Sequence, residues 1–202
     1  MATVNEPTSP AEEIRFVVGA AGSRYALGAA GSILGLPVVA VLSGSETLLF
    51  YVHVGLGAFW FGLDFFFRYV MAPALDRAGP ETAGAVIPHL TPKIMVVGES
   101  LTLGTIGSGI ALAYRLGYWS SPTIYLWGAL GVAGVMLLIA FGPLHSLQTA
   151  MLVELASPDP DGGRVGRLND RALRWLMGMT GLMLVVIAMM TGLRGLLPAV
   201  GG

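Results

Sequence analysis

Five apolar stretches alternate with shorter polar connections along the chain. Each contains at least the roughly 17 residues that the shortest bilayer-spanning helices need. The pattern therefore predicts an all-α fold, an integral membrane helical bundle of about five transmembrane helices that forms a single membrane domain over residues 1–202. The predicted spans cover about residues 26–42, 47–73, 92–116, 123–150 and 171–193.

The segments between the spans carry helix-start and turn signals. Ser9, Pro10 and Glu12 occupy the N-cap, first and third positions typical of a helix start, which predicts a short amphipathic helix within a cytoplasmic segment, residues 1–25. Pro37 predicts a kink in the first span. The second span is expected to stop at Pro73, before a turn-rich connection with room for a short interfacial helix. The expected cap of the third span is Thr91-Pro92, and the polar run SPDPDGGRVGRLND is a predicted loop.

Composition supports a membrane location and removes several classes of site. The chain is 54% hydrophobic and 11% charged with a mean hydropathy of +0.74, whereas soluble domains carry about 25% charged residues. We therefore expect the lipid bilayer to be the main partner of the protein. There are no cysteines, so disulfides, thiolate metal sites and catalytic thiols are excluded, and a net charge of −1 gives no reason to expect nucleic acid as a partner. The acidic start of the chain does not resemble a cleaved signal peptide.

The distribution of basic residues predicts the orientation. With the N-terminus in the cytoplasm, nine of the eleven basic residues fall on the inner side and two on the outer side, as the positive-inside rule requires. Aromatic residues cluster at the predicted outer ends, where they favour the headgroup level. We expect a multi-pass protein of a prokaryotic plasma membrane with its C-terminus outside. The inner basic residues are Arg15, Arg24, Arg68, Arg77, Lys93, Arg164, Arg167, Arg171 and Arg174, and the outer ones are Arg115 and Arg194.

Polar residues interrupt one face of the second span. At roughly 100° per residue, Gly57, Trp60 and Asp64 lie within about 40° of His53, so this stripe is expected to face other helices. Asp64 and Arg68 are spaced as an i,i+4 ion pair. The pair is either a structural feature near the inner boundary or part of a functional site, since ionisable residues in a membrane span are candidates by default.

The third span combines small residues with a carboxylate. Gly98, Thr102, Thr105 and Gly109 form a small-residue stripe that allows close helix approach. Glu99 borders it about 9 Å from the inner end, and Lys93 or Arg68 is its expected partner. A desolvated carboxyl suits proton transfer, and a carboxylate that only packs between helices is the alternative.

The fourth span contains a proline followed by a histidine. Pro143 lacks a backbone donor, so a kink is expected. His145 is either a ligand or an interfacial histidine, and with Asp64 and Glu99 it makes a candidate proton or ion site. His89, beside Pro88, is expected in a loop at the solvated surface.

The segment YVHVGLGAFWFGLDFFFRYVMAP carries the pattern H-x3-G-x2-W-x-G-x2-FFF-x5-P. It resembles a helix of a superfamily of small prokaryotic membrane bundles that includes CopD-type copper-resistance proteins, HemJ-type protoporphyrinogen oxidases and the membrane domain of certain urate oxidases. The resemblance implies haem b as cofactor, with His53 as the axial metal ligand and Trp60 packing on the porphyrin. It also implies that Lys93 and Arg68 bind the haem, with Arg68 meeting a propionate.

The depths of two histidines argue against a shared haem. His53 lies roughly 9 Å below the outer boundary and His145 roughly 33 Å below it, taking 1.5 Å per residue. Two axial ligands of one iron lie only about 4 Å apart. His53 and His145 are therefore not expected to bind the same iron.

Three functions remain open from the sequence. The first is a haem-b-binding membrane protein of redox or haem-related function. The second is a small transporter or proton- or cation-conducting bundle that uses Asp64, Glu99 and His145. The third is a non-catalytic subunit of a larger complex, or a homo-oligomer that associates through the stripe from Gly98 to Gly109. A cofactor-free enzyme is least expected, because no nucleophile–base pair, HExxH motif or phosphate-binding glycine loop is present.

Overall fold

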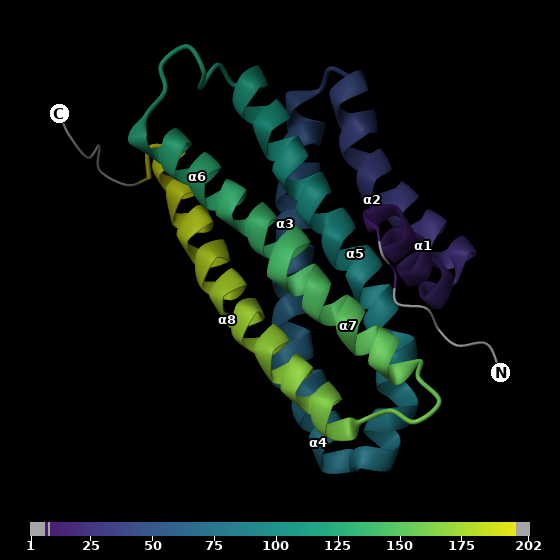
Figure 1. Cartoon of the computed structure of the whole chain (residues 1–202). Coiled ribbons are helices and arrows are strands. Elements are labelled where there is room, and N and C mark those ends of the chain that lie inside the picture. The colour runs from purple at the N-terminus through teal and green to yellow at the C-terminus, as the bar shows by residue number, and fades with distance from the viewer. Residues whose placement is uncertain (1–6, 8, 197–202) are drawn as a thin grey trace.

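The computed structural model describes residue 7 and residues 9–196, and over these residues it consists of helices and connections (Figure 1). Five helical segments are long and apolar enough to cross a membrane, so the chain is a multi-pass membrane protein, as predicted. The elements are α1 (Pro10–Ala21), α2 (Ser23–Leu42), α3 (Glu46–Phe66), η1 (Phe67–Met71), α4 (Ala72–Ala78), α5 (Pro80–Arg115), α6 (Ile124–Ile139), η2 (Ala140–Leu144), α7 (His145–Leu155) and α8 (Gly162–Leu193).

Several helices begin with a side chain that accepts a hydrogen bond from an otherwise unpaired backbone amide. The hydroxyl of Ser9 accepts from the amide of Glu12, so the predicted start of α1 is confirmed. Ser45 caps α3 and Thr123 caps α6 in the same way. The carboxylate of Asp161 caps α8 by accepting from two amides.

The second and third spans are longer than predicted. The second does not end at Pro73, because the chain passes through the π-helical turn η1 and Pro73 then falls in the first turn of α4, where a missing amide costs little. Gly79, with φ +89°, makes the reversal, and α5 starts at Pro80 instead of Pro92. His89 is exposed, as expected, but lies in α5 and not in a loop.

Two other spans begin earlier than predicted, and the kink predicted at Pro143 is present. α2 contains Pro37 inside a helix that already starts at Ser23. The first turns of α8 lie in the segment assigned to a polar loop. Pro143 falls in the π-helical turn η2, where Gly142 leaves helical geometry with φ −99° and ψ −106°. The fourth span is therefore a kinked helix from Ile124 to Leu155.

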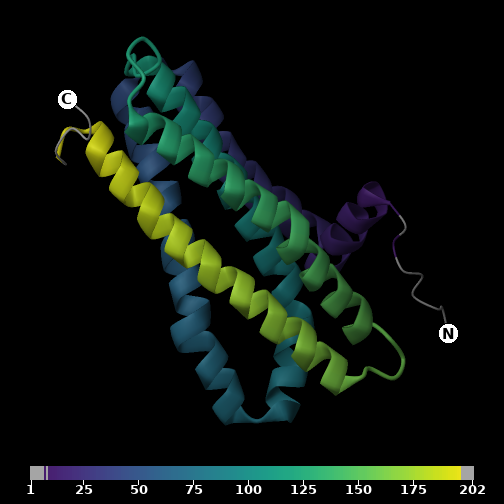
Figure 2. The same cartoon turned by 60° about the vertical axis from the view of Figure 1, so that its left-hand side comes forward.

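The five spans run alternately up and down, so their ends form two groups (Figure 2). The two groups differ in their content of basic residues. We call the basic end the one with the start of α2, the α4–α5 turn and the α7–α8 connection. It holds the nine basic residues predicted to lie together, and α1 packs there against α2 and α5. The opposite end holds Arg115, which donates to the carbonyl of Val41, and Arg194, whose guanidinium lies 4.8 Å from the centre of the Phe50 ring.

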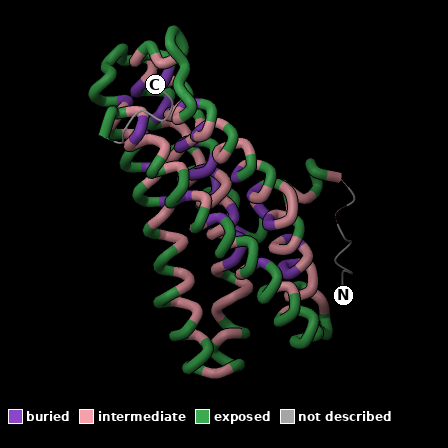
Figure 3. The backbone as a smooth tube through the Cα atoms, turned by 90° about the vertical axis from the view of Figure 1, so that its left-hand side faces the viewer, coloured by how far each residue is buried: buried purple, intermediate pink, exposed green. Residues whose placement is uncertain are grey.

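The inward stripe of α3 is confirmed, and it contributes to the main core. Trp60 and Leu56 pack with buried residues of α5, α6, η2 and α8. Phe59 and Tyr69, on other sides of the same segment, are exposed. No residue from 61 to 90 is buried, so the hairpin of α4 and the start of α5 extends beyond the closely packed part (Figure 3).

The small-residue stripe of α5 packs inside the chain. Thr102 is 2% exposed and Thr105 9%. A Cβ built on Gly109 would lie 2.7 Å from Cε1 of His53, and one on Gly104 would lie 3.3 Å from the backbone oxygen of Ile33. Much of the stripe from Gly98 to Gly109 therefore joins α5 to α2 and α3, and is not a free oligomerisation face.

Candidate functional site

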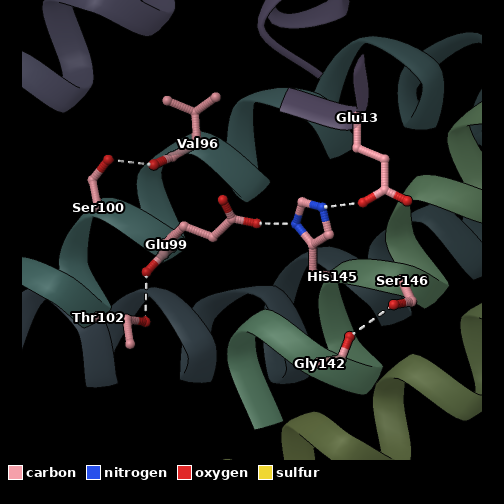
Figure 4. A network of polar contacts seen from close by, with 9 residues as sticks. Glu13, Val96, Glu99, Ser100, Thr102, Gly142, His145 and Ser146 are labelled. Atoms are coloured by element: carbon pink, nitrogen blue, oxygen red, sulfur yellow. Dashed lines mark hydrogen bonds and ion pairs between the residues drawn. The ribbon is translucent and has the colours of Figure 1, made fainter. Parts of the chain in front are cut away.

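A histidine at the basic end lies between two carboxylates that come from different helices (Figure 4). Nδ1 of His145 is 2.6 Å from Oε1 of Glu99 on α5, and Nε2 is 3.3 Å from Oε2 of Glu13 on α1. The His145 side chain is 12% exposed, against 25% for Glu99 and 33% for Glu13. Three helices thus supply one chain of titratable groups, which we call the Glu13–His145–Glu99 relay.

The kink in the fourth span places this histidine. η2 ends at Leu144, and His145 is the first residue of α7. The hydroxyl of Ser146 donates to the carbonyl of Gly142 at 3.0 Å, which satisfies one carbonyl of the distorted turn. π-helical turns occur often at functional sites. In this chain both described π-helical turns carry or adjoin an ionisable residue, Arg68 in η1 and His145 after η2.

The relay differs from the partners predicted for Glu99. Neither Lys93 nor Arg68 pairs with it, because His145 holds that position. Lys93 instead places its ammonium 5.7 Å from the centre of the Tyr25 ring on α2. Because the two carboxylates bind the two different nitrogens of one ring, they lie on opposite edges of it and do not surround a common point. Over the residues that the structure describes, no group of three or more histidines and carboxylates is arranged to hold a metal ion.

Asp64 belongs to a second cluster, separate from the relay. Its Oδ2 accepts a hydrogen bond from the hydroxyl of Thr180 of α8 and lies 3.6 Å from Nη2 of Arg68. The predicted i,i+4 pair is therefore confirmed, although its hydrogen-bonding partner is on another helix. Nε and Nη2 of Arg68 are buried without a hydrogen-bond partner. The structure thus joins two of the three predicted proton-site residues, Glu99 and His145, and places Asp64 elsewhere.

His53 forms a third polar cluster, nearer the opposite end. It is 6% exposed, and its Nδ1 lies 3.0 Å from the carbonyl oxygen of Thr105 and 3.2 Å from the hydroxyl of Ser108. A carbonyl oxygen can only accept, so Nδ1 carries the proton and Nε2 has the lone pair. Ser108 in turn donates to the carbonyl of Gly104 at 2.7 Å. The histidine is therefore fixed in one tautomer by α5.

Buried hydroxyls lie along α5 between His53 and the relay. Thr102 is three residues beyond Glu99 and donates to the carbonyl of Gly98 at 2.8 Å. Thr105 follows after another three residues, about 9 Å from Glu99 along the helix. Its hydroxyl is buried without a partner, and so is the hydroxyl of Thr149, one turn after His145. Buried hydroxyls without a hydrogen-bond partner are uncommon in folded proteins.

The four residues expected to bind haem b do not surround one space. Along α5, Lys93 lies twelve residues, or about 18 Å, before the carbonyl that binds His53. Along the α3 segment, Arg68 lies about 22 Å from His53. Trp60 packs in the protein core, and the backbone of α5 at Gly109 lies directly against the His53 ring. The arrangement does not fit a porphyrin held by all four residues, so haem b remains a prediction of the resemblance.

Two members of these clusters were not predicted from the sequence. Glu13 lies in the amphipathic start of the chain beside a second glutamate, so nothing in the pattern distinguishes it. Thr180 is one of two threonines in α8, a residue type whose hydroxyl usually bonds to its own backbone, and its hydroxyl also lies 3.0 Å from the carbonyl oxygen of Leu176. No protein-family model, curated protein or solved structure matches this chain.

Proposed function

We propose that the protein is a small proton-conducting membrane bundle, in which the Glu13–His145–Glu99 relay takes up protons at the basic end. The observation that supports this most strongly is the use of both His145 ring nitrogens by carboxylates of two other helices. Histidine changes charge near neutral pH and has one donor or acceptor on each side of its ring. It can therefore receive a proton on one edge and release another on the opposite edge.

The proton transfer balances within the three side chains. Nε2 of neutral His145 accepts a proton from the carboxyl of Glu13, while Nδ1 gives its proton to the carboxylate of Glu99. One proton arrives at the ring and one leaves, so the net charge of the relay does not change. Glu13, the most exposed of the three, is the end that exchanges protons with solvent. Glu99 is the end that faces the membrane interior.

Beyond Glu99 we propose a hydrated path along α5 to His53. Thr102, Thr105 and Ser108 supply hydroxyls in that direction, and the unpaired hydroxyl of Thr105 is a position for a bridging water. His53 and Ser108 then lie nearer the opposite end. The nine basic residues favour the cytoplasm for the basic end. We accordingly place the protein in a prokaryotic plasma membrane with protons exchanged at Glu13 on the cytoplasmic side.

The experiment for this proposal is proton flux into liposomes. Purified protein is reconstituted with a pH-sensitive dye inside, and a potassium diffusion potential drives proton movement. Glu99→Gln keeps the size and one acceptor oxygen of the side chain but removes the exchangeable carboxyl proton, so the flux is expected to fall by about tenfold or more, given the ~10²–10⁴-fold effects of acid–base groups. Glu81→Gln, an exposed glutamate at the start of α5, is the matched control. Equal flux for wild type and Glu99→Gln would reject the relay.

Haem-b binding is the second candidate, supported by the resemblance and by one observation. The hydrogen bond from Nδ1 of His53 to a backbone carbonyl leaves Nε2 free to ligate, which is the tautomer that metal-binding histidines adopt. We prefer proton conduction because its three central residues are in contact, whereas the proposed haem-binding residues are dispersed.

A further inference from the structure

A groove between α7 and α8 at the basic end has two arginines on one wall and an apolar surface beside them. Its volume is about 660 Å³. α7 and the preceding turn contribute Pro143, Ser146 and Leu147, and α8 contributes Arg171, Arg174 and Trp175. Each helix supplies residues at i, i+3 and i+4, so both present one continuous face to the groove.

The two arginines are available to a ligand. Arg171 and Arg174 are exposed, and among the described residues neither lies within ion-pair distance of a carboxylate. The next arginines toward the start of α8 differ, because Arg164 pairs with Glu154 at 2.9 Å and Arg167 with Asp161 at 3.7 Å. The guanidinium groups beside the groove therefore have no carboxylate partner, whereas those of Arg164 and Arg167 do.

The groove lies where the chain changes from charged to apolar. From Trp175 to Leu193 α8 contains no charged residue, while Arg171 and Arg174 immediately precede that run. A tryptophan at such a transition is typical of the headgroup level of a bilayer. Ser146 adds a hydroxyl at the same level, next to the first residue of α7. The polar part of the groove thus coincides with the membrane surface, and its apolar part faces the hydrocarbon.

We propose that this groove binds the phosphate of an anionic phospholipid. Arg171 and Arg174 donate to the phosphate oxygens, the geometry for which arginine is well suited. Pro143, Leu147 and Trp175 contact the glycerol region and the first part of the acyl chains. A second groove of about 610 Å³, lined by Gly134, Leu137, Leu138, Phe141 and Gly142, has no charged residue. The charge of the first groove is therefore not a general feature of the lipid-facing surface.

Competition in native mass spectrometry tests this site independently of proton conduction. Protein in mild detergent is mixed with equal amounts of phosphatidylglycerol and phosphatidylcholine, and the bound lipids are counted. We expect preferential retention of one phosphatidylglycerol. The double variant Arg171→Gln/Arg174→Gln is expected to weaken its binding roughly 30-fold, because each arginine contributes separately to anionic-lipid affinity. The variant Arg164→Gln/Arg167→Gln removes the same charge from the same helix outside the groove and should retain the lipid.

Two results would overturn the proposal. The first is equal loss of phosphatidylglycerol from both double variants, which would mean that general charge attracts the lipid. The second is displacement of the lipid by inorganic phosphate at millimolar concentration, which would assign the arginines to a soluble anion. Exposed arginines at these positions are not needed for packing, so both double variants should fold, and an unchanged thermal unfolding curve checks this.

Discussion

Nδ1 of His145 lies 2.6 Å from Oε1 of Glu99, although the two residues are 46 positions apart in the chain. The contact joins α5 to α7 just after the π-helical turn η2. Charge-assisted hydrogen bonds of this length are among the stronger ones in proteins. With Glu13 on the other side of the ring, they form a polar relay in a membrane protein otherwise dominated by apolar helices.

Gly109→Ala is expected to destabilise the protein. A Cβ there would lie 2.7 Å from Cε1 of His53, which is closer than real contacts allow. Overpacking of this kind costs about 1–3 kcal/mol, so thermal unfolding in detergent should shift to lower temperature. Gly107→Ala is the matched control on the same helix, since nothing lies within 4 Å of its added methyl group.

The double variant His53→Ala/Gly109→Ala tests whether contact with the His53 ring causes the destabilisation by Gly109→Ala. Removal of the imidazole makes room for the methyl group, so Gly109→Ala should cost less in that background than in wild type. An unchanged cost would show that the strain comes from another neighbour. The same series tests the close packing of α3 on α5 at the level of His53.

Thr180→Val should destabilise the protein by about 1–3 kcal/mol, because it removes the hydroxyl that donates to Asp64 and leaves the carboxylate with only a long ion pair. Valine has nearly the same shape as threonine, so the packing of α8 is preserved. The comparison is Thr191→Val, where the hydroxyl bonds only to the carbonyl of Ile187 in its own helix. Equal unfolding temperatures for the two variants would contradict the assigned role of Thr180.

A dithionite-reduced minus oxidised absorbance spectrum of the purified protein is expected to be flat, even with haem supplied during expression. The reason is that His53 is enclosed by α5 while Lys93 and Arg68 lie far from it along their helices. Sharp bands of the b type would contradict this expectation. Their loss in His53→Ala would then make haem binding the leading function.

Much of the fold could be predicted from the sequence because hydrophobicity alone identifies segments that lipid accepts. The limits of the second and third spans could not. The sequence pattern predicts a helix end at Pro73 and a helix start at Pro92, but a proline is tolerated inside a membrane helix where a π-helical turn or a neighbouring helix compensates for the missing hydrogen bond. Both prolines therefore lie within continuous helical segments.

Glu99 and His145 could be predicted as members of one site, but Glu13 could not, and the grouping of Asp64 with them is wrong. Glu99 and His145 are noticeable in the sequence because ionisable groups in apolar runs are costly. Their pairing depends on how the kink at η2 directs α7 toward α5. The direction of a kink cannot be predicted from the spacing of residues in the sequence. Glu13 joins them only because α1 packs against α5 at the basic end. Asp64, equally noticeable in the sequence, belongs to a different cluster, because its partners are Thr180 and Arg68.

Proton conduction through the relay is tested by the initial rate of potential-driven proton flux in three kinds of liposome: with wild-type protein, with His145→Gln and without protein. Glutamine at position 145 retains hydrogen-bonding groups but cannot carry a proton between Glu13 and Glu99. For wild type we expect flux above that of the empty liposomes, and for His145→Gln a reduction of about tenfold or more. Flux that is equal for the two proteins, or no greater than in empty liposomes, would contradict proton conduction through the relay.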